Sequence, residues 1–377
     1  MNAGHVATEG AGSGSAANVS SARDDLLTAV FGVWMIVGLF TDGWAHLNLP
    51  GLETFFTPWH GLLYSGFAAG AAWLAVLALR GRRTALPWAR ALPPGYGLAA
   101  VGVVLFGAGG VGDMVWHIVF GVEIGIDALL SPTHLVLLTG ASLMLTAPLR
   151  AIWRRPVTGG RSTLRGELPA VLALALVTAL ASFFLLYVSV FTNPAAAAGE
   201  LTRIPERAPG HEAAELPAIA GLAGYLVTTV LLVAPLLLAE RLGRRPRGAT
   251  ALVVGMVAWL SVVVGGFTPL GIAMASAVTA AAGVVDFVIH TIDQTSLART
   301  TKLAVSAAAL PVLIWPAQLA AVAVTEGVRW PVELWSGVVV LSALVAAALA
   351  TISAWAPAGR DTERIVTRPR TADVASV

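Results

Sequence analysis

Apolar residues occur in long runs along most of this chain, and short polar segments separate the runs. Each run has about the 20 residues that an α-helix needs to cross the hydrocarbon core of a bilayer. A Gly-Gly-Phe-Thr-Pro turn at 265–269 divides the longest run into two helices. The pattern predicts an all-α, polytopic membrane helix bundle of about ten transmembrane helices, over residues 26–45, 58–79, 96–119, 132–149, 168–191, 216–239, 249–266, 269–290, 303–325 and 331–355.

The composition of the 377 residues narrows the class of protein further. Charged residues make up 12% of the chain and apolar residues 57%, whereas soluble domains carry about a quarter charged residues. A soluble enzyme is therefore excluded. The absence of cysteine excludes disulfides, iron–sulfur clusters and thiolate metal sites. Residues 1–24 are rich in Gly, Ser and Ala and lack an apolar run, so we expect a disordered tail there and no signal peptide.

Positive charge is distributed unevenly between the two sides of the predicted bundle. If the N-terminus is inside, 20 of the 23 Lys and Arg residues lie on inner segments, and the exceptions are Arg203, Arg207 and Arg329. Cytoplasmic loops of membrane proteins carry this excess of basic residues. Eleven acidic residues fall on the outer segments. The sequence therefore predicts a multi-pass protein of the plasma (inner) membrane, with both termini cytoplasmic and an acidic outer face.

The outer ends of the first four predicted helices carry one motif twice. Each pair of helices has the pattern Asp-x3-His, a loop, then Thr/Ser-Pro-x-His, and 71 residues separate the two aspartates. An Asp and a His four residues apart lie on one helix face, and Pro-x-His places a second His in the first turn of the returning helix. This internal repeat predicts a duplicated hairpin in helices 1–4. Its chemical groups are Asp42, His46 and His60 in the first copy and Asp113, His117 and His134 in the second.

Two imidazoles and one carboxylate form a ligand set that suits Fe(II), Zn(II) or Cu(II). Glu123 and Asp127, in the second loop, are candidates for further ligands or for hydrogen-bond partners of the imidazoles. Helix capping and interfacial anchoring explain a single Asp or Thr-Pro, but they do not explain His at both matching positions, twice. Haem ligation by paired histidines is a further alternative, and it leaves both carboxylates without a role.

The motif resembles part of the C subunit of the copper membrane monooxygenases, the particulate methane and ammonia monooxygenase family. That subunit has an Asp-x3-His helix with a Trp-His pair, followed by Thr-Pro-Ser-His at the start of the next helix. The residues that match it are Asp113, Trp116-His117 and Ser131-Pro132-Thr133-His134, and in the first copy Asp42, His46 and Thr57-Pro58-Trp59-His60. The resemblance covers about 20 residues per copy. It implies a copper site near the outer face at Asp113, His117 and His134, with a sister site or shared ligands at Asp42, His46 and His60. It also implies partner subunits, and hydrocarbon or ammonia oxidation as one outcome, although the duplication and the ten spans depart from the family.

A third Asp-x3-His pattern, Asp286 and His290, is predicted at the inner end of the eighth helix, away from the duplicated motif. We expect Asp286 to cap the helix and to meet Arg299 or Lys302, with an inner proton or ion station as the alternative.

The long outer segment 192–215 contains His211, Glu212 and Glu215. We expect a solvated, flexible loop there, with metal capture as the alternative.

These features predict four parts: a disordered cytoplasmic tail at 1–24, the duplicated hairpin pair at 25–150, a six-helix membrane region at 151–356 and a cytoplasmic tail at 357–377. The leading hypothesis is an outward-facing Asp/His site that binds copper, with iron or zinc as alternatives. It would serve either oxidative chemistry on a small or lipophilic substrate, which would make the protein an oxidoreductase, or copper handling. The second hypothesis is a transporter or channel that passes protons or divalent cations along the same residues. The third is a structural subunit of a larger membrane complex; a nucleic-acid partner is not expected.

Overall fold

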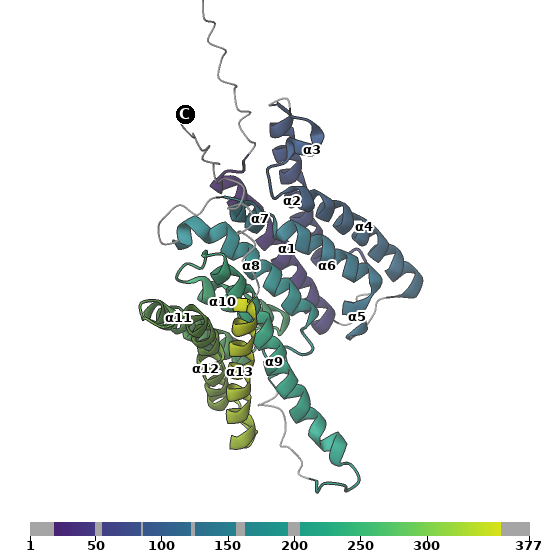
Figure 1. The fold of residues 1–377 in the computed structure, drawn as a ribbon. Coiled ribbons are helices and arrows are strands. Elements are labelled where there is room, and N and C mark those ends of the chain that lie inside the picture. Colours follow the sequence, from purple (N-terminus) through teal and green to yellow (C-terminus); the bar gives the residue numbers. More distant parts are fainter. Residues whose placement is uncertain are drawn as a thin grey trace, which may run out of the picture.

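The computed structural model describes residues 19–49, 55–83, 86–121, 125–155, 163–194 and 204–355. Within these ranges all regular secondary structure is helical, as the sequence predicts. The helices are α1 (Ala22–Asn48), α2 (Pro58–Arg83), α3 (Trp88–Ala91), α4 (Gly97–Phe120), α5 (Asp127–Leu130), α6 (Pro132–Leu145), α7 (Ala147–Trp153), α8 (Leu164–Phe184), α9 (His211–Arg241), α10 (Ala249–Val264), α11 (Pro269–Asp293), α12 (Arg299–Thr325) and α13 (Val332–Trp355). Nine spans in this part of the chain are long and apolar enough to cross a membrane, and α6 and α7 together form one of them. The protein is therefore a helical membrane bundle (Figure 1).

Three predicted spans differ from the helices that form. The span 168–191 ends early because α8 stops at Phe184 and the chain continues in turns, where Asn193 Nδ2 donates to the carbonyl oxygen of Leu186 at 2.8 Å. The span 132–149 is interrupted at Thr146, since Pro148 in the first turn of α7 has no N–H to continue the helical hydrogen bonds. The 16 residues of α10 extend about 24 Å, which is less than the roughly 30 Å of hydrocarbon in a bilayer. The predicted span 249–266 therefore forms an apolar helix that is too short to be counted with the other nine.

The helices form two groups that meet at α8 and α10 (Figure 1). In one group, α1 and α2 pack as an antiparallel hairpin, α4 and α6 pack as a second hairpin, and α8 contacts both α1 and α6. In the other group, α11, α12 and α13 pack side by side, and α9 packs against α13. The duplicated motif lies in the first group, at the end where α1 and α4 terminate and α2 and α6 begin.

Glycines allow the two helices of each hairpin to approach closely. A Cβ added at Gly66 of α2 would lie 2.7 Å from Cα of Met35 in α1, and one at Gly140 of α6 would lie 2.6 Å from the backbone nitrogen of Phe106 in α4. Small residues commonly permit such contact between membrane helices. Both glycines stand six residues after the Pro-x-His histidine, and both contacted residues stand seven before the aspartate. The two hairpins therefore share a packing contact at matching positions.

Buried hydrogen bonds join the hairpins at the end remote from the duplicated motif. Asp25, at the start of α1, accepts a hydrogen bond from Tyr96 Oη at 2.7 Å and pairs with Arg155 at 2.5 Å. Trp73 of α2 donates to Thr28 Oγ1 at 3.1 Å, and this hydroxyl also meets Tyr96 Oη at 3.2 Å. The network connects the first hairpin to the residues that precede and follow the second.

Candidate metal centre

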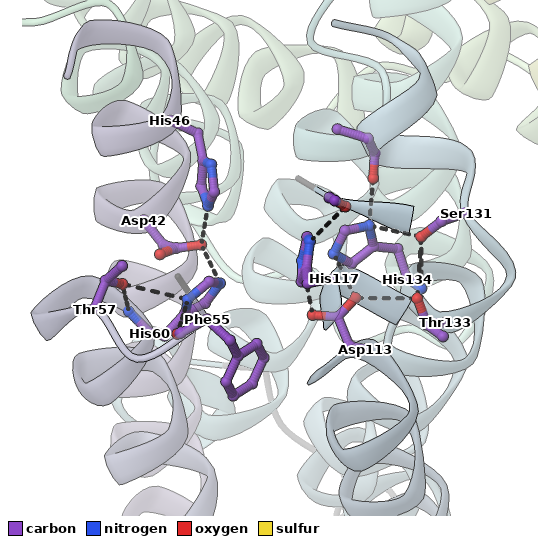
Figure 2. Close-up of polar contacts among 12 residues, drawn as sticks. Asp42, His46, Phe55, Thr57, His60, Asp113, His117, Ser131, Thr133 and His134 are labelled. Carbon is purple, nitrogen blue, oxygen red and sulfur yellow. Dashed lines mark hydrogen bonds and ion pairs between the residues drawn. The ribbon is translucent and has the colours of Figure 1, made fainter. Parts of the chain in front are cut away.

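Asp42, His46 and His60 meet at one end of the first hairpin and form the first trio (Figure 2). Asp42 and His46 lie one turn apart on α1, and His60 lies in the first turn of α2. Oδ2 of Asp42 lies 3.7 Å from Nε2 of His46 and 3.4 Å from Nε2 of His60. Asp42 and His60 are both only 7% exposed, whereas His46 is open to the exterior. The geometry confirms that Pro-x-His places its histidine across the hairpin from the Asp-x3-His pair.

Asp113, His117 and His134 form the second trio, at the matching end of the second hairpin (Figure 2). Oδ2 of Asp113 lies 3.6 Å from Nε2 of His117, and Oδ1 lies 3.2 Å from Nε2 of His134. Asp113 is 2% exposed. In each trio the three candidate ligand atoms lie within 4.8 Å of one another, so each could hold one metal ion.

The Pro-x-His histidine of each trio has its Nδ1 atom fixed by a residue that precedes the returning helix. Nδ1 of His60 donates to the carbonyl oxygen of Phe55 at 2.7 Å, and Nδ1 of His134 donates to that of Ala128. A carbonyl oxygen only accepts, so Nδ1 carries the proton and the Nε2 of a neutral ring presents its lone pair to the aspartate. Two such acceptors at 3.2–3.4 Å repel each other unless a metal ion lies between them or the ring takes up a second proton at Nε2. This arrangement, with Nδ1 bound to a carbonyl, is typical of histidines that ligate a metal through Nε2.

The two trios differ at the residue between Pro and His. In the second trio this residue is Thr133, whose Oγ1 donates to Oδ1 of Asp113 at 3.0 Å. In the first trio it is Trp59, which packs edge-on against Trp44 and offers no hydroxyl. Oδ1 of Asp42 is consequently buried without a hydrogen-bond partner among the described residues. A buried carboxylate oxygen needs a compensating partner, and a bound cation at the first trio would supply one.

Both trios line one cavity of about 820 Å³ that lies between the hairpins. The rings of His60 and His117, one from each trio, have centroids 6.4 Å apart, and Phe55 stacks on His60 at 4.9 Å. Leu186 and Tyr187, in the turns after α8, also line the cavity. The early end of α8 therefore contributes to the wall of the site.

Away from the trios the cavity is apolar, with a floor formed by Met35, Ile36, Phe106, Ala141 and Leu180. Met35 precedes Asp42 by seven residues on α1, and Ala141 follows His134 by seven on α6, so the floor lies about 10 Å from the trios. The combination of two ligand clusters and an apolar floor can hold metal ions beside a lipophilic molecule.

The other predicted residues have different outcomes. Glu123 lies outside the described residues. Asp127 begins α5 and is exposed, and its role beside the imidazoles stays a prediction. The partners that sequence reasoning missed are the carbonyl groups of Phe55 and Ala128 and the hydroxyl of Thr133. Backbone carbonyls carry no residue-specific signal, whereas the Thr/Ser-Pro-x-His pattern did mark the hydroxyls of Thr57 and Ser131, which receive the N–H of His60 and His134.

The third Asp-x3-His pattern has a structural role at the opposite end. Asp286 accepts hydrogen bonds from the backbone N–H groups of Thr250 and Ala251, at 3.3 and 3.2 Å. It therefore caps the neighbouring helix α10, and its basic neighbour is Arg245, at 3.7 Å, where the sequence suggested Arg299 or Lys302. Burial lowers the pKa of the Arg245 guanidinium.

His290 and His211 also lie apart from the trios. Arg247 and Gln294 contact the His290 ring. His211 begins α9, so residues 211–215 are helical and the expected loop is shorter than predicted. The N-terminal end of α9 extends beyond the neighbouring helices in Figure 1. Among the described residues, the two trios are the groups that could hold a metal ion.

Comparison with known proteins finds no matching family model, no curated protein of similar sequence and no solved structure of similar fold. Function is therefore inferred from the two trios and the cavity.

Proposed function

We propose that this protein is an integral membrane metalloprotein that binds copper at its two trios and carries out oxidative chemistry on a molecule held in the cavity. One observation supports this most directly. The Nε2 atoms of His60 and His134 lie beside buried carboxylates in the wall of an apolar cavity, and the Nδ1 protons of both rings are bound by backbone carbonyl oxygens. Copper would supply redox chemistry, while the protein's own residues orient the imidazoles and exclude water from the floor. Copper handling without turnover is the simpler version of the same proposal.

The donor set supports a metal of intermediate hardness. Nitrogen and carboxylate donors without sulfur suit Cu(II), Fe(II) and Zn(II), and the resemblance to the copper monooxygenase C subunit favours copper. The matching glycine contacts support the inference that the hairpins are copies of one unit, since equivalent positions pack in the same way in both. The arginine distribution supports an extracytoplasmic position for the trios.

Transport of protons or divalent cations is the second candidate. It is favoured by the ionisable cluster of Glu240, Arg245 and Asp286 near the opposite end of the bundle. The apolar floor of the cavity opposes it, because a conduction path needs polar groups or water along its length. Copper or proton flux into proteoliposomes separates the two candidates, and flux that depends on His60 and His117 would favour the carrier.

The decisive test is the metal content of the detergent-purified protein after copper loading and removal of loosely bound ions. We expect up to two copper ions per chain in the wild type and a near-complete loss in the His60→Ala/His117→Ala double variant, which removes one ligand from each trio. His211→Ala is the matched control, because His211 lies on α9 away from both trios. Equal, near-zero copper in the wild type and the double variant would overturn the proposal.

A further inference from the structure

The cavity wall changes from polar to apolar along its depth. Apart from the six trio residues, the polar side chains that the described residues contribute to the wall are those of Tyr64 and Tyr187. The floor offers hydrocarbon alone, and a polar group there would lose its hydrogen bonds to water without replacement. An occupant must therefore be lipophilic along the floor and can carry polarity only near the trios.

The volume of the cavity indicates the size of the occupant. Pockets of about 300–1,000 Å³ are typical for organic ligands of drug size, and this cavity measures about 820 Å³. A molecule of one or two heavy atoms would leave most of the floor without contacts, and floor contacts are the main source of affinity for a lipophilic ligand. A longer molecule, extending the roughly 10 Å from the trios to the floor, fits the cavity better.

Tyr64 stands where the polar and apolar parts of the cavity meet. It follows His60 by one turn of α2, and its ring centroid lies 6.4 Å from that of His60 and 6.0 Å from that of Phe106 in the floor. A Cβ added at Gly110 would lie 2.8 Å from Tyr64 Oη, so the missing side chain at Gly110 leaves room for the hydroxyl. The hydroxyl forms no hydrogen bond within the described residues.

The Tyr64 hydroxyl belongs to one hairpin alone. The matching position in the second hairpin is Leu138, which also lines the cavity. Repeat geometry therefore does not account for the phenol, and helix packing would be served as well by phenylalanine. A phenol in the wall of a cavity, beside two ligand clusters, is suited to hold a polar group of a bound molecule.

We propose that the cavity binds one lipophilic molecule with a neutral hydroxyl head, of the long-chain or aromatic alcohol class. The head accepts a hydrogen bond from Tyr64 Oη between the two trios, and the hydrocarbon body lies on the floor. This proposal names a substrate class for the proposed metal site, and the reaction of that substrate rests on the proposed function. The binding itself requires no metal, so it can be tested separately.

The test is photolabelling of the full-length protein in detergent with a diazirine-bearing decan-1-ol, followed by peptide mapping, with excess decan-1-ol as competitor. We expect competed labelling on peptides that contain floor residues. Ala141→Phe fills the floor and is expected to reduce this labelling at least tenfold, and Leu39→Trp narrows the cavity from a half-buried wall position that tolerates a larger side chain. Ala68→Phe, on an exposed face of α2, is the matched control and should label as the wild type does.

Tyr64→Phe keeps the ring and removes the hydroxyl, so we expect the competitor's apparent affinity to fall about 2- to 10-fold, the range for one lost hydrogen bond. Decane, which has no head, should compete equally well in the wild type and in Tyr64→Phe. Wild-type affinity for decan-1-ol in Tyr64→Phe would refute the role of the hydroxyl. Uncompeted labelling spread over lipid-facing helices, unchanged in Ala141→Phe and Leu39→Trp, would refute the binding site.

The two proposals fail in different ways. If decan-1-ol suppresses the labelling of floor peptides in a protein that binds no copper, the metal function is overturned and the site for the lipophilic molecule stands. Copper at both trios with no competed labelling would do the reverse. Running the labelling on chelator-treated and copper-loaded protein gives both results from one preparation.

Discussion

Substituting Thr133 with valine tests whether the carboxylate of the second trio is a metal ligand. Valine preserves the shape of threonine but removes the Oγ1–H that donates to Oδ1 of Asp113 at 3.0 Å. Asp113 is 2% exposed, so water cannot readily replace the lost donor. Oδ1 of Asp113 would then lack the hydroxyl donor that fixes its orientation.

The size of the effect follows from the role of such partners at metal sites. Removing a group that hydrogen-bonds a ligand typically lowers metal affinity about 10- to 100-fold, or about 1.4–2.7 kcal/mol. The first trio has Trp59 at the matching position and lacks this hydrogen bond, so its affinity should not change. The prediction is thus a selective loss at one of two sites.

Competition titration of Cu(II) against a chelator measures this loss directly. In a His60→Ala background the first trio is disabled, so the titration reports on the second trio. Thr139→Val is the matched control, because Thr139 is exposed on the same helix and its hydroxyl bonds the backbone oxygen of Leu135 at 2.9 Å. Unchanged affinity in Thr133→Val, or an equal loss in Thr139→Val, would refute the role of the Thr133 hydroxyl in holding Asp113 for a metal.

Three further predictions concern stability in detergent. Gly66→Ala should destabilise the protein by about 1–3 kcal/mol, because the new Cβ would lie 2.7 Å from the backbone of α1. Gly61→Ala is the control and should not destabilise it, because the space around Gly61 is open. Equal midpoints of chemical unfolding for the two variants would contradict this packing. Asp25→Asn should cost roughly 3 kcal/mol, the lower end for a broken buried pair, since Arg155 keeps partial access to water. An unchanged midpoint would show that the hydrogen bonds around Asp25 do not stabilise the fold. Copper at about 100 times its dissociation constant should stabilise the wild type by about 2.7 kcal/mol for each trio that it occupies, reversibly by chelation. A shift of the same size in the double trio variant would indicate binding elsewhere.

The sequence determined the membrane bundle and the six candidate ligands because both depend on local patterns. Apolar runs of helix-spanning length need no tertiary information, and nine spans among the described residues have the length and apolarity that the runs predict. The i, i+4 spacing of Asp42 and His46 fixes both groups on one helix face, and a short loop followed by Pro-x-His fixes where His60 must return. The sequence thus predicted each trio, since every member lies within one hairpin.

The relation between the trios was decided by tertiary structure alone. Nothing local brings His60 within 6.4 Å of His117, because their contact depends on how two separate hairpins pack together and against α8. The same packing encloses the cavity and places Tyr64 at the boundary of the floor. Likewise, Asp286 shares the Asp-x3-His pattern, yet the neighbouring end of α10 makes it a helix cap. Local spacing selects which residues can act together, and the packing of distant helices decides what they face.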